Sequence, residues 1–103
     1  MSYTFSVAYP AGTTFDLNYY LTSHMPLVQK LWAPHGLKSW RVAQYTNPDS
    51  PYVIQAWLEW ESKEAYEKGQ ASLEGADVFK DVPKFSDKTP VLLHGELVGS
   101  ASW

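Results

Sequence analysis

Residues 53–60, VIQAWLEW, are the most informative part of the sequence for the fold. Alternate side chains of a β-strand point to opposite faces of a sheet, and both faces of this stretch contain large apolar residues. They are Val53 and Trp57 on one face and Ile54, Leu58 and Trp60 on the other. We therefore expect these residues to form a strand in a sheet that is covered on both sides.

Strand and helix patterns alternate on either side of this strand. Period-two alternation predicts further strands over residues 3–9, 37–45 and 91–98. Helical spacing predicts one helix over about 16–32 and a second over about 62–72, while residues 75–87 are expected to be irregular. This order predicts an α+β fold of the ferredoxin-like βαββαβ type, with an antiparallel sheet and both helices on one face.

Composition indicates one small globular domain that spans residues 1–103. Of the 103 residues, 45% are hydrophobic and 18% are charged, which is far from the composition of disordered chains. A chain of this size gains from burying surface against a partner, and a second sheet would cover the free face of residues 53–60. We therefore expect a homodimer. The aromatic content of 16% is high for such a core and favours rings at an interface or around a pocket.

Charge and composition exclude several classes of partner and site. The net charge is −3 and no basic run is present to neutralise phosphates, so nucleic acid is not an expected partner. The chain has no cysteine, which excludes disulfides, thiolate nucleophiles and Cys-ligated metals. The first residues lack a signal-peptide pattern and no apolar run reaches ~20 residues, so we expect a cytoplasmic protein without membrane contact.

A histidine interrupts the apolar stripe of the first predicted helix. Pro26 follows His24 by two residues and removes a helical donor, which predicts a kink or break near His24. An imidazole on an apolar face titrates near neutral pH and is tuned by burial, so His24 is the candidate acid/base. The alternative is a hydrogen-bonded core histidine that fixes the kink. Tyr20, one turn earlier, either shares a ligand oxygen with His24 or packs in the core.

The segment FDLNYYLTSHMPLV, residues 15–28, resembles the first helix of the EthD-like family of dimeric α+β barrel proteins. In that family a Tyr-Tyr or Tyr-Trp pair is followed by His-x-Pro, and the spacing of Tyr20, His24 and Pro26 is the most specific part of the match. The resemblance makes a functional role of His24 about as well supported as the structural one, and Tyr20 remains a candidate beside it.

The remainder of the chain resembles the same family. GADVFKDVPKFSDKTP, residues 75–90, is similar to its irregular connection, and HGELV, residues 94–98, to its last strand. The resemblance implies a homodimer in which sheets and helices enclose an apolar pocket. The wider superfamily includes cofactor-free monooxygenases, lactone isomerases, polyketide cyclases and haem-binding proteins, and some EthD-like proteins carry a reductase label.

Residues outside the first helix complete the candidate pocket. The polar candidates on the strands are Gln55 and His94, although a strand histidine at this position is more often half-exposed than catalytic. Aromatic candidates are expected to divide between pocket wall and dimer core: Tyr9, Trp40, Trp57, Trp60, Phe79 and Phe85.

No cofactor or metal is expected. The three histidines lie on separate predicted elements without HxH or HxxxH pairing, so the sequence predicts no metal site and gives no support for haem ligation. It also contains neither a G-x-G-x-x-G nor a P-loop fingerprint for a nucleotide.

Three functions fit these observations. The leading one is a homodimeric, cofactor-independent enzyme that acts on a small apolar aromatic or polyketide-type metabolite by acid/base chemistry. It would be an isomerase, a dehydratase or cyclase among the lyases, or a monooxygenase among the oxidoreductases, with His24 as acid/base. The second is a non-catalytic dimer that binds a lipophilic metabolite, in which His24 only donates a hydrogen bond. The third is a dimerisation scaffold with a filled core.

Overall fold

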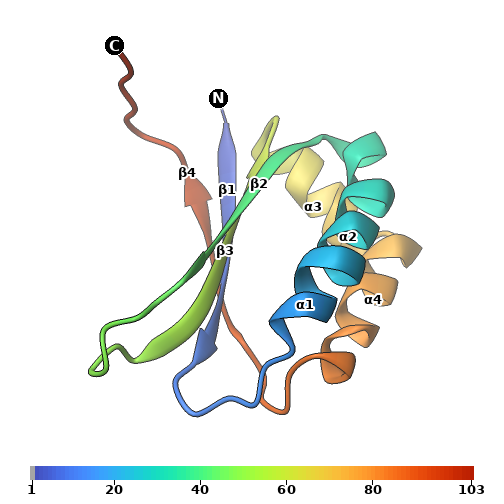
Figure 1. Cartoon of the computed structure of the whole chain (residues 1–103). Helices are drawn as coiled ribbons and strands as arrows, with labels where there is room; N and C mark the ends of the chain where they lie inside the picture. Colours follow the sequence, from blue (N-terminus) through green and yellow to red (C-terminus); the bar gives the residue numbers. More distant parts are fainter. Residues whose placement is uncertain (1) are drawn as a thin grey trace.

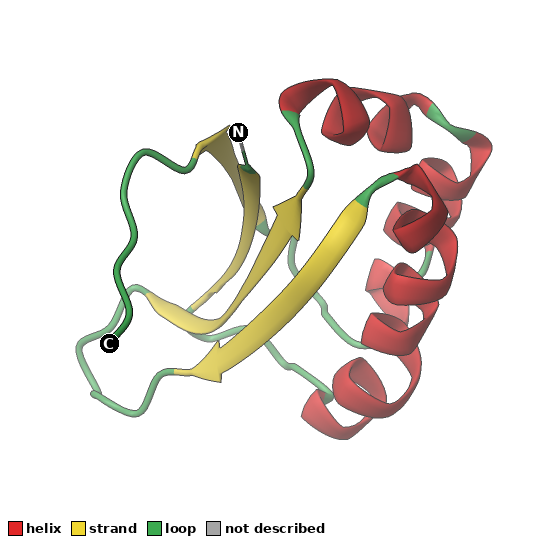
Figure 2. Cartoon of the chain, turned by 90° about the horizontal axis from the view of Figure 1, so that it is seen from above, coloured by secondary structure: helices red, strands yellow, loops and turns green. Residues whose placement is uncertain are grey.

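A four-stranded antiparallel sheet forms one layer of the molecule, and helices cover one of its faces (Figures 1 and 2). The computed structural model describes residues 2–103. Its strands are β1 (Tyr3–Pro10), β2 (Leu37–Gln44), β3 (Tyr52–Trp60) and β4 (Val91–Glu96). They lie in the order β2-β3-β1-β4, and each neighbouring pair is antiparallel. The predicted ferredoxin-like βαββαβ fold is therefore confirmed.

Two connections build the helical layer. The connection from β1 to β2 contains α1 (Leu17–Tyr19), η1 (Tyr20–His24), α2 (Met25–Trp32) and η2 (Ala33–His35). The connection from β3 to β4 contains α3 (Lys63–Ala71), α4 (Leu73–Lys80) and η3 (Val82–Lys84). Along residues 2–103, no helix has both the length and the apolar character needed to cross a membrane.

Local signals in the sequence begin and end these helices. The Asp16 side chain accepts a hydrogen bond from the backbone N–H of Tyr19, and Ser62 accepts one from Ala65. Each therefore satisfies a backbone donor that the first turn of a helix leaves free. Gly36 ends the first helical connection with φ of 111°, in the left-handed region that glycine adopts most readily.

The prediction of an irregular segment over residues 75–87 is wrong, because α4 and η3 occupy most of it. Ser72 caps α4 by accepting a hydrogen bond from the backbone N–H of Gly75, and Val78 is buried on its inner side. α4 is only eight residues long, so its apolar residues complete too few turns to show a clear period.

The kink predicted near His24 is a π-helical turn inside a continuous helical segment. The backbone N–H of Met25 bonds to the carbonyl of Tyr20, five residues earlier. Pro26 has no N–H to donate and its ring crowds the carbonyl four residues before it, so a wider turn accommodates the ring. The extra residue in this turn points both His24 and Met25 into the core and leaves Leu21 40% exposed.

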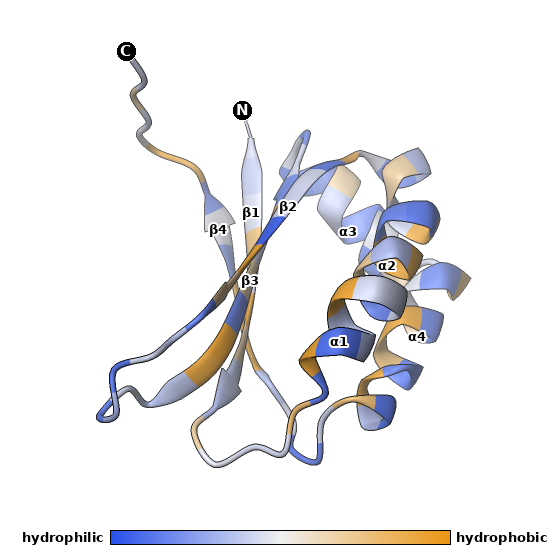
Figure 3. Ribbon diagram, in the orientation of Figure 1, coloured by the Kyte–Doolittle hydropathy of each residue, from blue (hydrophilic) through white to orange (hydrophobic). Residues whose placement is uncertain are grey.

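The two faces of the sheet differ in what covers them. On β3, the side chains that point toward the helices are at most 2% exposed: Ile54, Ala56, Leu58 and Trp60. The opposite, outer face contains Gln55 and Trp57, both only partly buried. Hydrophobic and hydrophilic residues alternate along the helices in Figure 3, as expected where each helix has one buried side. The core therefore lies between the helices and the inner face of the sheet.

Candidate functional site

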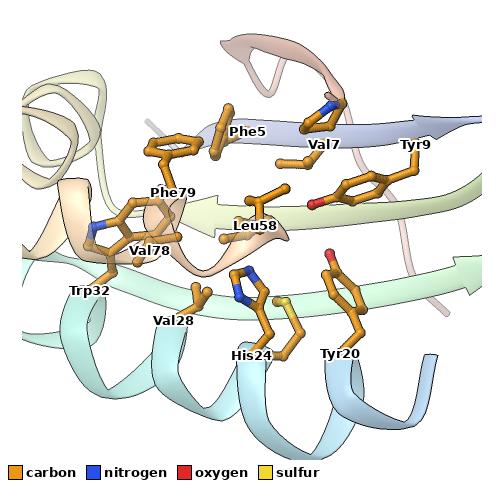
Figure 4. Close-up of a pocket in the computed structure, with 13 residues that line it drawn as sticks. Phe5, Val7, Tyr9, Tyr20, His24, Val28, Trp32, Leu58, Val78 and Phe79 are labelled. Atoms are coloured by element: carbon orange, nitrogen blue, oxygen red, sulfur yellow. The ribbon is translucent and has the colours of Figure 1, made fainter. Parts of the chain in front are cut away.

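A small apolar cavity lies between the helices and the inner face of the sheet (Figure 4). Its volume is about 20 Å³, which is space for roughly one water molecule. The lining residues come from β1, β3, both helical connections and the segment before β4: Phe5, Val7, Tyr9, Tyr20, His24, Met25, Val28, Trp32, Leu58, Val78, Phe79, Val82 and Pro90. Four of the lining side chains have an N–H or O–H group: Tyr9, Tyr20, His24 and Trp32, whose indole N–H is buried without a hydrogen-bond partner within residues 2–103.

His24 is held by a buried carboxylate on the other helical connection. Its Nδ1 lies 2.9 Å from Oδ2 of Asp81, and the two residues are 5% and 6% exposed. An ionised carboxylate only accepts hydrogen bonds, so the proton of the neutral imidazole is on Nδ1. The other ring nitrogen, Nε2, then has a free lone pair, and His24 is among the residues that line the cavity.

The second carboxylate oxygen of Asp81, Oδ1, contacts two further donor groups. The Tyr19 hydroxyl donates to Oδ1 at 2.9 Å, and the Lys84 ammonium lies 3.4 Å from the same atom. Asp81 also forms the C-terminal cap residue of α4, where the helix dipole disfavours a negative charge. The helix dipole therefore does not stabilise the negative charge of Asp81. The charge is stabilised by the three side chains that contact the carboxylate, those of His24, Tyr19 and Lys84.

Burial and hydrogen bonding set the protonation of the pair. Burial lowers the pKa of His24 below its usual value, although the hydrogen bond and charge of Asp81 act in the opposite direction. Burial by itself would raise the pKa of Asp81, but hydrogen bonds from His24, Tyr19 and Lys84 outweigh it and lower the pKa. At neutral pH the pair is thus a neutral imidazole that donates to a carboxylate, and the imidazole is ready to accept a proton.

The start of the first helical connection is tied to the end of the second. The backbone N–H of Asp16 donates to the carbonyl of Phe85 at 2.8 Å, and Phe15 forms an isolated β-bridge with Ser86. These contacts hold η3 against the π-helical turn. The ring of Phe85 consequently packs 4.5 Å from the ring of His24, centroid to centroid.

The structure brings together only some of the site residues predicted from sequence. His24, Tyr20, Tyr9 and Phe79 line the cavity, and Phe85 packs behind His24. Tyr20 stacks on His24 with centroids 5.3 Å apart and rings inclined by 15°.

The remaining predicted residues lie elsewhere in the fold. Gln55 and Trp57 are on the outer face, opposite the cavity, because alternate residues of β3 face opposite sides. Trp40 on β2 donates its indole N–H to Gln29, at the edge of the helical layer. His94 on β4 is exposed and pairs with the Tyr3 hydroxyl. None of these four residues lines the cavity, although the sequence predicted all four as residues of the candidate pocket.

Sequence reasoning missed Asp81 and Tyr19. Asp81 is separated from His24 by 57 residues and lies at the end of a helix that was expected to be irregular. No spacing rule connects two residues that meet only through the packing of separate helical connections.

A haem, like any ligand larger than a water molecule, would enter this cavity of about 20 Å³ only after its walls move. Over residues 2–103, no group of three or more His, Cys, Asp or Glu residues is arranged to hold a metal ion.

Structural comparison relates this fold to EthD-like proteins. No family model and no curated protein matches the sequence. An EthD-like protein from Ralstonia eutropha JMP134 is 25% identical, with a TM-score of 0.83 over 98% of this chain and 96% of that chain. An ethyl tert-butyl ether D (EthD) family protein from Bacillus halodurans C-125 is 23% identical, with a TM-score of 0.72 over 95% and 99% of the two chains.

A third solved structure shares the fold at lower identity. It is a dimeric protein of unknown function with a ferredoxin-like fold from Bacteroides fragilis NCTC 9343, which is 10% identical with a TM-score of 0.57 over 93% of this chain and 95% of that chain. The structural matches confirm the resemblance to EthD-like proteins that residues 15–28 indicated.

Proposed function

Because this chain has the fold of EthD-like proteins over nearly its whole length, we propose that it is a cofactor-independent enzyme that moves a proton on a small, largely apolar molecule, with His24 as acid/base. The observation that supports this proposal is the buried His24–Asp81 pair beside an apolar cavity. Nε2 takes a proton from the substrate and returns it to another atom. Asp81 keeps the ring in the required tautomer and stabilises the imidazolium while it exists.

The nature of the cavity walls restricts the substrate. Apolar side chains surround His24, so a flat, uncharged molecule of the aromatic or polyketide type fits the surface better than a sugar or a phosphate. A cavity that binds benzene is about 150 Å³, so the substrate enters only after part of the wall moves. Phe79 is the most exposed of the wall residues, at 36%, and its displacement would open the site.

A homodimer is the second part of the proposal. The outer face of the sheet has no helical cover in either view of the chain (Figures 1 and 2), although it contains Trp57 and Leu93. A protein of the same fold is described as dimeric. Two outer faces packed against each other would bury these residues, as sheets do in a sandwich.

A generic proton-abstraction assay tests the role of His24. The probe is 5-nitrobenzisoxazole, an apolar bicyclic compound that opens to a coloured nitrophenolate when a base removes one C–H proton. We expect the protein to accelerate this opening, and His24→Ala to lower kcat/KM by about 10²–10⁴-fold, the usual contribution of a general base. His24→Gln, which keeps a hydrogen bond to Asp81, distinguishes lost chemistry from lost folding.

The matched control is His35→Ala. His35 lies in η2 outside the cavity, so its removal leaves the rate unchanged. Binding of the probe without turnover would instead favour the non-catalytic binding protein. Equal rates for the His24 variants and the unmodified protein would refute His24 as the base.

A further inference from the structure

Two tyrosine hydroxyls in the cavity lack a partner. Tyr9 and Tyr20 are 1% and 2% exposed, and Figure 4 shows both hydroxyl oxygens pointing into the cavity toward each other. Within residues 2–103 neither hydroxyl forms a hydrogen bond. By contrast, the hydroxyls of Tyr3, Tyr19 and Tyr45 are paired with His94, Asp81 and Gln55.

Neither hydroxyl is among the fully buried polar atoms without a partner, so each reaches the space of the cavity, where a water molecule or a ligand can supply the missing hydrogen bond. Two such groups on different elements, β1 and η1, face the same small space. Burial raises the pKa of both hydroxyls above its usual value, so both are protonated at neutral pH. The arrangement is complementary to one acceptor oxygen on a ligand.

The base lies beside these donors. The rings of Tyr9 and Tyr20 meet edge to face with centroids 5.9 Å apart, and Tyr20 stacks on His24 at 5.3 Å. The rest of the lining contains no charged side chain, and its other side-chain donor is the indole N–H of Trp32, which has no hydrogen-bond partner within residues 2–103. No lysine or arginine of the described chain lines the cavity, and Lys84, which contacts Asp81, is 66% exposed. A ligand that is charged before reaction would therefore find no counter-ion, whereas a neutral ligand with one acceptor oxygen fits.

We propose that the substrate is a neutral, enolisable carbonyl compound whose oxygen accepts hydrogen bonds from Tyr9 and Tyr20 while its α-carbon faces His24. This substrate class rests on the proposed role of His24. In the step, the α C–H bond breaks and its electrons form the C=C bond of an enolate. The carbonyl π electrons move to the oxygen, where the two hydroxyls stabilise the negative charge. The proton forms a bond to Nε2, and its return to carbon or oxygen completes the cycle without an oxidant or reductant.

Hydrogen–deuterium exchange tests the proposal without knowledge of the full reaction. The probe is 2-tetralone, an apolar aromatic ketone, and the loss of its α-proton signal in D₂O is followed by ¹H NMR. We expect the protein to accelerate exchange above the buffer rate. Tyr9→Phe and Tyr20→Phe each keep the ring and remove only the hydroxyl. Each should slow exchange by about 10²-fold, as when one donor to a developing oxyanion is lost.

Tyr45→Phe is the matched control. Its hydroxyl bonds to Gln55 on the outer face, so exchange should stay at the rate of the unmodified protein. Thermal unfolding of each variant checks that the ring still packs.

The outcomes separate this proposal from the role of His24. Exchange that depends on His24 but is unchanged in both Tyr9→Phe and Tyr20→Phe overturns the oxygen-binding pair and leaves the base in place. Turnover of 5-nitrobenzisoxazole without any exchange of 2-tetralone overturns the carbonyl substrate class alone. Absence of activity on both probes overturns the substrate class and the acid/base function together.

Discussion

Replacing Asp81 with asparagine separates the structural role of its carboxylate from its role in the chemistry of His24. The amide is the same size as the carboxylate and its oxygen can still accept the Nδ1 proton of His24, which lies 2.9 Å away in the native pair. Hydrogen bonds to charged groups contribute about 1.5–3 kcal/mol and neutral ones about 0.5–1.5 kcal/mol. We therefore expect Asp81→Asn to lower the free energy of unfolding by about 1 kcal/mol at the His24 bond. It should fall further because the amide nitrogen replaces the oxygen that accepts from Tyr19 and contacts Lys84.

Asp81→Ala should be more damaging, because it leaves the Nδ1–H of a residue that is 5% exposed without an acceptor. A buried donor without a partner costs about 1–3 kcal/mol. In a domain of this size each kcal/mol corresponds to roughly 4–8 °C in Tm. Thermal unfolding followed by circular dichroism should therefore rank the variants as native, then Asp81→Asn, then Asp81→Ala.

The chemistry of Asp81→Asn should change more than its stability. Without the carboxylate charge, the remaining effect of burial lowers the pKa of His24 further, and the forming imidazolium loses its counter-ion. We expect the rate of 5-nitrobenzisoxazole opening to fall by about 10²-fold or more, and the NMR titration of His24 to move to lower pH. Asp77→Asn is the control, since it removes the same charge from an exposed site on α4. A stable Asp81→Asn variant with the native rate and an unshifted titration would refute the reasoning.

Two further predictions concern the assembly and the response to acid. Trp57→Lys places a charge on the outer face of the sheet and should convert a dimer to a monomer in analytical ultracentrifugation. Leu73→Lys, on the helical layer where Leu73 is 87% exposed, should not, and a monomeric unmodified protein would contradict the proposed interface. The pKa of His24 is lower in the folded chain than its usual value of 6.5, so the unfolded chain binds the proton first as pH falls. The contribution of neutral His24 to the free energy of unfolding should be fully present above pH 6.5. It should be lost as the pH falls from 6.5 through the lower pKa of His24 in the folded chain. His24→Gln should remove that part of the pH dependence of Tm, and an unchanged slope would show that another group causes it.

The elements of this fold were predictable because their signals are local. Period-two alternation marked residues 3–9, 37–45, 53–60 and 91–98, and each range overlaps one strand of the sheet, with ends that differ by up to two residues. The apolar residues of α2 and the cap at Ser62 marked helices in the same way. The helix α4 was not predicted because its signal is also local. Its eight residues complete too few turns to show a helical period.

Only part of the candidate site could be predicted from the sequence. His24 stood out because a histidine in an apolar stripe is unusual, and Tyr20 because it lies one turn earlier. The direction of the β3 side chains was not visible, since both faces of residues 53–60 contain large apolar groups. That ambiguity is why Gln55 and Trp57 were assigned to the pocket although they lie on the outer face.

Local pattern along the chain thus specified the order of strands and helices, the likeness to EthD-like proteins and the candidate base, because each depends on residues within a few turns of one another. Packing specified the carboxylate on His24, the orientation of Tyr9 toward Tyr20 and the small size of the cavity. Asp81 meets His24 across 57 residues, and Tyr9 reaches Tyr20 from a strand to a helix. Contacts of this kind depend on how separate elements pack together, and no spacing within one element encodes them.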